Sequence, residues 1–400
     1  MQSVRVSDRR ARVAGSVAYA VQGVCFAALV TRIPALKDRF GLDEASLALL
    51  LVIVPLVAGV GSVTAGAVGA RVGCSRVLRV MGPVVPLSLV AVGLSTTLPV
   101  LVASLVVVGL GLGSVDAAMN THGVAVQARY RRSLMASFFA VFSLAGIVGA
   151  GLAAIAAATA LTLAAFFALI AVVVVPVQLA VGSHLLRGLV ESGGSAHDAS
   201  AGAAHRPAVE WRPIVFIGVA LTCVYVADSA ASNWGAVYLN DALGSTESVA
   251  ALGYLVYALT TLLARIVIDR GVSTRGPVML VRAGGLISVA SVIALAVAPT
   301  PAVGLVAFAA LGIGIAPVIP LAFSAAGSHD PEGTGVAVAR VNVFNYVGFV
   351  LGAPLVGLIA EASSLRWAFA ALAPLLMIAV LLAPRFAVAP PSTPVGTNSA

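Results

Sequence analysis

Residues 109–123 read GLGLGSVDAAMNTHG and place a carboxylate, Asp116, inside an apolar segment long enough to cross a bilayer. An ionisable side chain in hydrocarbon costs at least about 2.5 kcal/mol, so it usually faces a bundle interior or a water-filled path. Asn120 follows at i+4 and shares a helix face with Asp116. The glycines that precede this pair favour close helix packing or close approach of a ligand. We therefore expect Asp116 to mark an ion or solute path.

The composition of the whole chain is that of an integral membrane protein. Of 400 residues, 60% are hydrophobic and 10% are charged, whereas a soluble domain has roughly 25% charged residues. The apolar stretches are about 20 residues long, which suits helices that cross about 30 Å of hydrocarbon rather than barrel strands. The net charge of +8 is explained by basic loops between spans, so no nucleic-acid partner is expected.

Hydropathy, broken at clusters of Gly, Pro and charged residues, predicts an all-α membrane fold with twelve transmembrane helices. The expected spans are 13–35, 46–66, 78–96, 98–122, 134–155, 161–182, 213–238, 248–268, 277–297, 301–323, 337–359 and 366–384. A hydrophilic stretch, 184–212, predicts a flexible cytoplasmic linker between an N-terminal half, 1–183, and a C-terminal half, 213–385. Residues 386–400 are expected to form a disordered cytoplasmic tail.

An internal repeat supports this division into six-helix halves. A shift of 203 residues aligns five pairs at the same places of each half: Gly73 with Gly276, Arg79 with Arg282, Gly109 with Gly312, Gly111 with Gly314, and Gly149 with Gly352. Two parallel pseudo-repeats related by an axis along the membrane normal are typical of one transporter architecture. Asp116 has no acidic counterpart, because Ile319 occupies that position.

The basic residues predict the orientation of the chain. With the N-terminus inside, cytoplasmic segments hold 19 of the 23 Lys and Arg residues, as the positive-inside rule requires. We therefore expect a multi-pass protein of a bacterial inner (plasma) membrane with both termini in the cytoplasm.

The loop after the second span, residues 66–76 (GAVGARVGCSR), resembles the Gly-x-x-x-Asp-Arg-x-Gly-Arg-Arg signature of the major facilitator superfamily. Ala70 replaces the acid and Cys74 replaces one basic residue. The second-half counterpart, 265–275, keeps an acid–arginine pair. The resemblance implies gating loops, although arginines that only set topology are the alternative. The implied gating residues are Gly66, Arg71, Gly73, Arg76, Arg265, Asp269 and Arg270.

Within that superfamily the chain is similar to the fucose-permease-related branch. The similar segments are 32–37 (RIPALK), 116–123 (DAAMNTHG), 233–239 (NWGAVYL) and 345–357 (NYVGFVLGAPLVG). In fucose permease the acid of the corresponding acid-x-x-x-Asn motif carries a proton, and the resemblance implies this role for Asp116. Val30 stands near the place of a first-span carboxylate, and Phe139 replaces a histidine found in relatives. Fucose specificity is therefore not expected.

Further polar residues fall in spans that line the centre of such a fold. Asp228, in the seventh span, has three open interpretations: proton coupling, solute binding or a buried structural bond. Neutral amides and aromatic faces suit a polar, ring-bearing solute, with packing between helices as the alternative. The candidate lining residues are Gln22, Asn120, Tyr225, Asn233, Trp234, Tyr254, Tyr257, Asn342, Asn345 and Tyr346.

Together these features predict a secondary active transporter rather than an enzyme, because no nucleotide-binding loop and no catalytic or metal-site motif occurs. No cofactor is expected. The expected partners are a small-molecule solute, protons and the lipid bilayer, and the expected state is a monomer. A sugar or other neutral polar solute is favoured. The alternatives are a proton-driven efflux antiporter for a drug-like metabolite and, more remotely, a non-transporting membrane receptor.

Overall fold

A computed structural model of the chain describes residues 6–42, 44–159, 161–186, 211–330 and 333–387. Most of the predicted linker and tail lies outside the described residues. All regular structure in these ranges is helical. Twelve helices are long and apolar enough to cross a membrane, which confirms the predicted fold class and number of spans.

The N-terminal bundle consists of α1 to α7, and the C-terminal bundle consists of α9 to α16. The N-terminal helices are α1 (Val6–Thr31), α2 (Ile33–Phe40), α3 (Glu44–Val72), α4 (Cys74–Leu94), α5 (Leu98–Tyr130), α6 (Met135–Ala158) and α7 (Leu163–Gly182). The C-terminal helices are α9 (Trp211–Val237), α10 (Glu247–Arg275), α11 (Pro277–Val297), α12 (Pro301–Ile315), α13 (Val318–Ser328), α14 (Val336–Ala362), α15 (Leu365–Ala370) and α16 (Leu372–Leu382). A π-helical turn, Tyr238–Ala242, extends α9, and a 3₁₀ turn, Ala383–Phe386, follows α16.

Several helices differ from the predicted spans. The first begins at Val6, before the apolar run, and α5 continues to Tyr130. The predicted tenth span is divided into α12 and α13 around Pro317, because proline lacks an N–H and disrupts the preceding turn. Hydropathy detects only the part of a helix that crosses the hydrocarbon. Backbone hydrogen bonds continue the helix beyond that part, into polar residues.

The repeated glycines pack helices against each other in the same way in both bundles. A side chain at Gly109 would meet the backbone of Val54 in α3, and one at Gly312 would meet Tyr257 in α10. These two contacts are related by the same 203-residue shift. Gly111 against α4 and Gly314 against α11 repeat the pattern. In lipid the hydrophobic effect does not drive helices together, so the close packing that these small residues allow stabilises the helix contacts instead.

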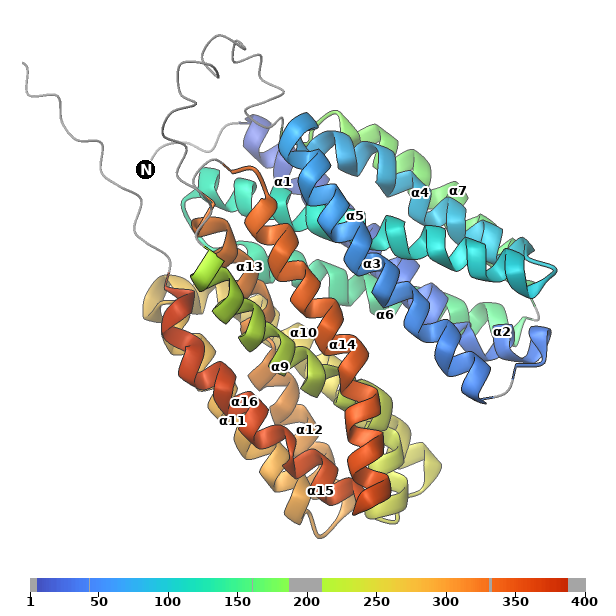
Figure 1. Cartoon of the computed structure of the whole chain (residues 1–400), viewed down its shortest axis with the longest axis vertical. Coiled ribbons are helices and arrows are strands. Elements are labelled where there is room, and N and C mark those ends of the chain that lie inside the picture. Colours follow the sequence, from blue (N-terminus) through green and yellow to red (C-terminus); the bar gives the residue numbers. More distant parts are fainter. Residues whose placement is uncertain (1–5, 43, 160, 187–210, 331–332, 388–400) are drawn as a thin grey trace, which may run out of the picture.

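The two bundles meet at one end and spread apart at the other, so that the molecule has the form of a V (Figure 1). At the joined end α3 packs on α14, and α6 packs on α10. The diverging arms end near α2 and α15 (Figure 1). Large apolar side chains such as Val172, Val173 and Leu381 are more than 60% exposed, which suits helices surrounded by lipid rather than water.

Candidate functional site

Asp116 lies where the two bundles meet, and it accepts hydrogen bonds from both. Gln22 of α1 donates its Nε2–H to Asp116 Oδ1 at 2.9 Å. The hydroxyl of Tyr346, on α14, donates to Oδ2. Gln22 also donates to the carbonyl of Leu112 at 3.1 Å, which fixes its amide. The carboxylate is thus turned away from hydrocarbon and linked to both bundles.

Asn120 lies one turn further along α5 and bonds within the N-terminal bundle. The hydroxyl of Tyr19 donates to Asn120 Oδ1 at 2.6 Å, and both side chains are buried. The Tyr19 ring stacks on Phe138 with centroids 5.2 Å apart. Phe139 then stacks on Phe323 of α13 at 5.7 Å, which joins the bundles. Aromatic rings therefore form a layer between Asp116 and the joined end.

A second polar group surrounds Asp228 on α9. The hydroxyl of Tyr257, on α10, donates to Asp228 Oδ1. The Tyr254 and Tyr257 rings lie 6.4 Å apart, and Tyr254 is 52% exposed. Asp228 is also an electrostatic neighbour of Arg265. This arrangement brings an acid, two phenols and a guanidinium together in the C-terminal bundle.

Arg265 is a correction to the sequence analysis, which placed it in a cytoplasmic gating loop. It lies inside α10, well before Arg275 ends that helix, and is 8% exposed. Its Nη1 donates to Ser143 Oγ of α6 at 2.5 Å, and its guanidinium lies 5.5 Å from the centre of the Phe139 ring. Its Nε has no hydrogen-bond partner. The hydropathy-based span 248–268 already contained Arg265, and the resemblance to the superfamily signature assigned it to the loop. The guanidinium is accommodated by the other bundle rather than by water.

Four of the candidate lining residues form hydrogen bonds with groups other than Asp116 and Asp228. Asn233 is exposed and donates to the Ser229 carbonyl of its own helix at 2.7 Å. Trp234 donates to the Ala353 carbonyl of α14 at 3.0 Å. Asn345 donates to Asn342, whose own amide donates to Ser62 of α3 at 3.1 Å. The Asn233 bond stays within α9, the Trp234 bond packs α9 against α14 in the C-terminal bundle, and Asn342 joins the bundles.

Asp269 of α10 holds the start of α6 at the joined end. Its Oδ1 accepts from Ser133 Oγ at 2.7 Å and from the Ala136 N–H at 3.2 Å. Its Oδ2 accepts from the Ser137 N–H at 2.8 Å. The first N–H groups of a helix lack intrahelical partners and carry partial positive charge, so a carboxylate is favoured there. Asp269 therefore caps a helix of the opposite bundle.

The α3–α14 contact closes the other side of the same end. Ser62 Oγ donates to the Ala339 carbonyl at 3.1 Å, and Gly66 leaves room for the Ala339 side chain. Gly73 and its repeat partner Gly276 have φ values of 93° and 76°, which favour glycine in these turns. The candidate gating residues Arg71, Arg76 and Arg270 are exposed at this end.

At the opposite end, arginines tie each bundle internally. Arg39 Nη1 donates to the Gly93 carbonyl at 2.7 Å. Arg366 Nη1 donates to the Ala298 carbonyl at 2.8 Å. Sequence reasoning gave these arginines no role beyond their position outside the cytoplasmic segments. Their bonds keep each bundle rigid where the two bundles are separate.

Two helical bundles joined at one end, with an acid of α5 bonded across them, define a two-half membrane transporter. The chain belongs to the Major Facilitator Superfamily, whose model matches residues 15–339. It is 32% identical to an uncharacterized MFS-type transporter of Yersinia pestis over 370 residues, covering 92% of this chain and 93% of that protein. It is 28% identical to the membrane protein MosC of Rhizobium meliloti over 348 residues, covering 86% and 82%.

Solved structures share this fold. The outward conformation of the superfamily transporter FucP matches with a TM-score of 0.75 and 14% identity, covering 94% of this chain and 98% of that one. The human organic anion transporter MFSD10 matches with a TM-score of 0.77 and 14% identity, covering 94% and 99%. The proton:xylose symporter XylE matches with a TM-score of 0.72 and 12% identity, covering 95% of each chain. The predicted resemblance is confirmed, and the chain is a multi-pass secondary transporter rather than an enzyme.

Proposed function

We propose that this transporter couples the movement of a small organic solute to protons, with Asp116 as the proton site. The observation that carries the proposal is the hydrogen bond from Tyr346 to Asp116, because it joins the two bundles through an ionisable group. Gln22 occupies the other carboxylate oxygen. Both neighbours donate, so the ionised form of Asp116 stabilises this arrangement of α1, α5 and α14.

Protonation of Asp116 would weaken that arrangement. Hydrogen bonds to a charged acceptor are roughly twice as strong as neutral ones, and a protonated carboxyl brings a donor of its own against the Tyr346 hydroxyl. The α5–α14 contact would then be released, and α14 could move with the rest of its bundle. A proton that binds one conformation better than the other shifts the equilibrium between them, which is what proton-coupled alternating access requires.

The orientation is part of the proposal. The positive-inside count assigns the end that carries Gly73, Arg132 and Gly276 to the cytoplasm. Because the bundles join at that end and separate at the other, the described conformation is then open to the outside. Protons and solute would enter from outside and leave after the Asp269 and Ser62 contacts break. The six-helix halves, 1–183 and 213–385, would be the moving units.

For the solute we favour a sugar or another neutral polar molecule, because the exposed Tyr254 ring and the Asn345 amide offer a face and a donor to hydroxylated rings. The shared fold of the proton:xylose symporter is consistent with this class. A second candidate is a solute with an anionic group. The buried Arg265, bonded to a neutral hydroxyl, favours it.

The test uses purified protein in proteoliposomes. Thermal-shift screening with fucose, xylose and small carboxylates identifies a solute, and its accumulation is then measured under an inward proton gradient. Asp116→Asn is expected to lose accumulation and keep solute counterflow. Asp38→Asn, which removes an exposed acid from α2, is the control and is expected to accumulate normally. An Asp116→Asn protein that still concentrates solute would contradict the proton role.

Arg265→Gln separates the two solute classes. Loss of the thermal shift by a carboxylate, with the shift by a sugar kept, would support the anionic candidate. If a carboxylate solute still gives the same thermal shift, Arg265 does not bind the solute. The proton role of Asp116 is then decided by the accumulation assay, which does not depend on Arg265.

A further inference from the structure

Helices α1 and α6 cross tightly near their middle and separate toward the joined end. A side chain at Gly23 would meet the Phe142 carbonyl, and one at Gly149 would meet the Val24 carbonyl at 2.7 Å. Nearer the start of α6, Phe138 instead stacks on Tyr19. At this end α6 therefore lies over the Tyr19 side of α1. The other side of α1, around Val13, Ser16 and Val17, is left uncovered.

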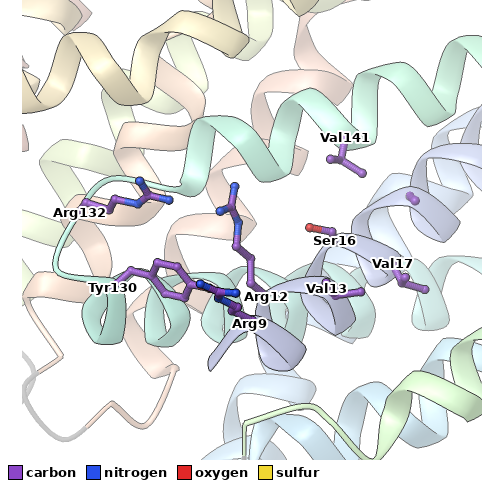
Figure 2. A pocket seen from close by; sticks show the side chains of 9 residues that line it. Arg9, Arg12, Val13, Ser16, Val17, Tyr130, Arg132 and Val141 are labelled. Atoms are coloured by element: carbon purple, nitrogen blue, oxygen red, sulfur yellow. The ribbon is translucent and has the colours of Figure 1, made fainter. Parts of the chain in front are cut away.

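A pocket of about 580 Å³ occupies this space and is open to the outside of the bundle. We call it the α1–α6 wedge, and its lining residues are Arg9, Arg12, Val13, Ser16, Val17, Ala20, Tyr130, Arg132 and Val141. Figure 2 shows arginines entering it from two elements, α1 and the turn between α5 and α6. The wedge lies apart from the Asp116 site, because Tyr19 and Gln22 point from the opposite side of α1.

Three arginines make the polar end of the wedge strongly basic. The guanidinium carbons of Arg12 and Arg132 lie 5.8 and 5.5 Å from the centre of the Tyr130 ring. This shared ring holds the two cations near each other through cation–π attraction. The neighbouring acid Asp8 pairs with Arg129 at 3.3 Å. Within the described part of the chain, Arg9, Arg12 and Arg132 have no carboxylate partner.

The other end of the wedge is apolar and continues into the part of the helices that crosses the membrane. Val13 and Val17 share one face of α1 at i and i+4. Val141, Leu144 and Val148 share one face of α6 at i, i+3 and i+7, and the last two are 55% and 50% exposed. Basic residues at a membrane surface next to an exposed apolar groove complement an anion that carries a hydrocarbon tail.

We infer that the α1–α6 wedge binds an anionic phospholipid. The guanidinium groups of Arg9, Arg12 and Arg132 bind its phosphate, and one acyl chain lies along Val13, Val17 and Val141. Arginine suits this role because its planar donors match phosphate geometry, and basic pockets between membrane helices favour acidic headgroups. The site does not depend on the solute, on the direction of transport or on which membrane surface bears it.

The experiment measures lipid binding to the purified full chain by native mass spectrometry. The protein, delipidated in a neutral detergent, is titrated with phosphatidylglycerol or with phosphatidylcholine of the same acyl chains. We expect phosphatidylglycerol to bind at least tenfold more tightly. The triple variant Arg9→Gln/Arg12→Gln/Arg132→Gln should lose at least tenfold in affinity for phosphatidylglycerol and bind phosphatidylcholine as before. Arg275→Gln, which removes an exposed arginine from α10, should behave as the unchanged protein.

Two results of the lipid titrations would overturn the inference. One is equal binding of the two lipids by the unchanged protein, a comparison that needs no variant to fold. The other is phosphatidylglycerol binding by the triple variant that equals that of Arg275→Gln. A third arm adds inorganic phosphate as competitor: complete displacement of the lipid at equal concentration would mean that the wedge recognises a free anion, whereas retention of the lipid supports the acyl contacts.

Discussion

The Asp269 cap gives a quantitative prediction about the joined end. Replacing Asp269 with Ala removes a carboxylate that accepts from Ser133 Oγ and from the N–H groups of Ala136 and Ser137, at 2.7 to 3.2 Å. Hydrogen bonds to a charged group are worth about 1.5–3 kcal/mol each, but the freed groups regain water when the end opens. We therefore expect a net loss of about 2–3 kcal/mol, which shifts the equilibrium toward separation of α6 and α10 roughly 30- to 150-fold.

Double electron–electron resonance between spin labels at Ala128 and Ser273 measures this shift. Both positions are exposed at the joined end, one on each bundle. The Asp269→Ala protein should gain a population at longer distance. Asp269→Asn keeps the shape without the charge and should give a smaller shift. Asp241→Asn changes an exposed acid at the other end of the molecule and should leave the distances unchanged. A distance distribution in Asp269→Ala that equals that of the unchanged protein would refute the role of this cap.

Three further predictions concern packing, the bond between bundles and the exposed arginines. Gly113→Ala should lower the thermal unfolding midpoint in detergent by an amount equivalent to about 1–3 kcal/mol, because its new methyl group would overlap a carbonyl of α3. Tyr346→Phe should lose the bond to the central acid and lower proton-driven accumulation about tenfold, since that bond is charge-assisted. Arg71→Ala or Arg270→Ala should change the rate of opening at the joined end, measured as solute counterflow.

Matched controls separate these effects from general damage. Gly151→Ala adds the same methyl group to a helix where nothing lies within 4 Å, so it should not lower the midpoint, and equal losses at Gly113 and Gly151 would rule out the packing explanation. Tyr130→Phe removes a hydroxyl at the end of α5, away from Asp116 and the candidate solute site, and an equal transport loss there would contradict the role of Tyr346. If counterflow is unchanged, Arg71 and Arg270 have no gating role and only set the membrane topology of the chain.

The fold was largely predictable because its signals are local or periodic. Span number follows from hydropathy over about 20 residues, and the repeat follows from glycines at a constant offset, which the structure explains as equivalent packing contacts. Helix ends were less predictable. The division at Pro317 was missed because proline is common in membrane helices and the segment remains apolar throughout.

The sequence identified residues of the candidate site but not the contacts between them. Asp116 stood out because a carboxylate in an apolar segment is rare, and Tyr346 and Gln22 were identified as polar residues of lining helices. That both donate to Asp116 depends on how α1 and α14 are rotated about their axes. Tyr19 carries only one sequence signal: it lies three residues before Gln22 and therefore on a similar face.

By itself the sequence determined that the chain is a twelve-helix membrane protein with repeated halves and an isolated acid in its fourth span, since composition and spacing along the chain carry that information. Only the tertiary structure decided that Asp269 caps α6, that Arg265 is buried against Ser143, and that α1 and α6 leave a basic wedge. Each of these joins residues far apart in the chain. Helix crossing angles and rotations set such contacts, and hydropathy does not record them.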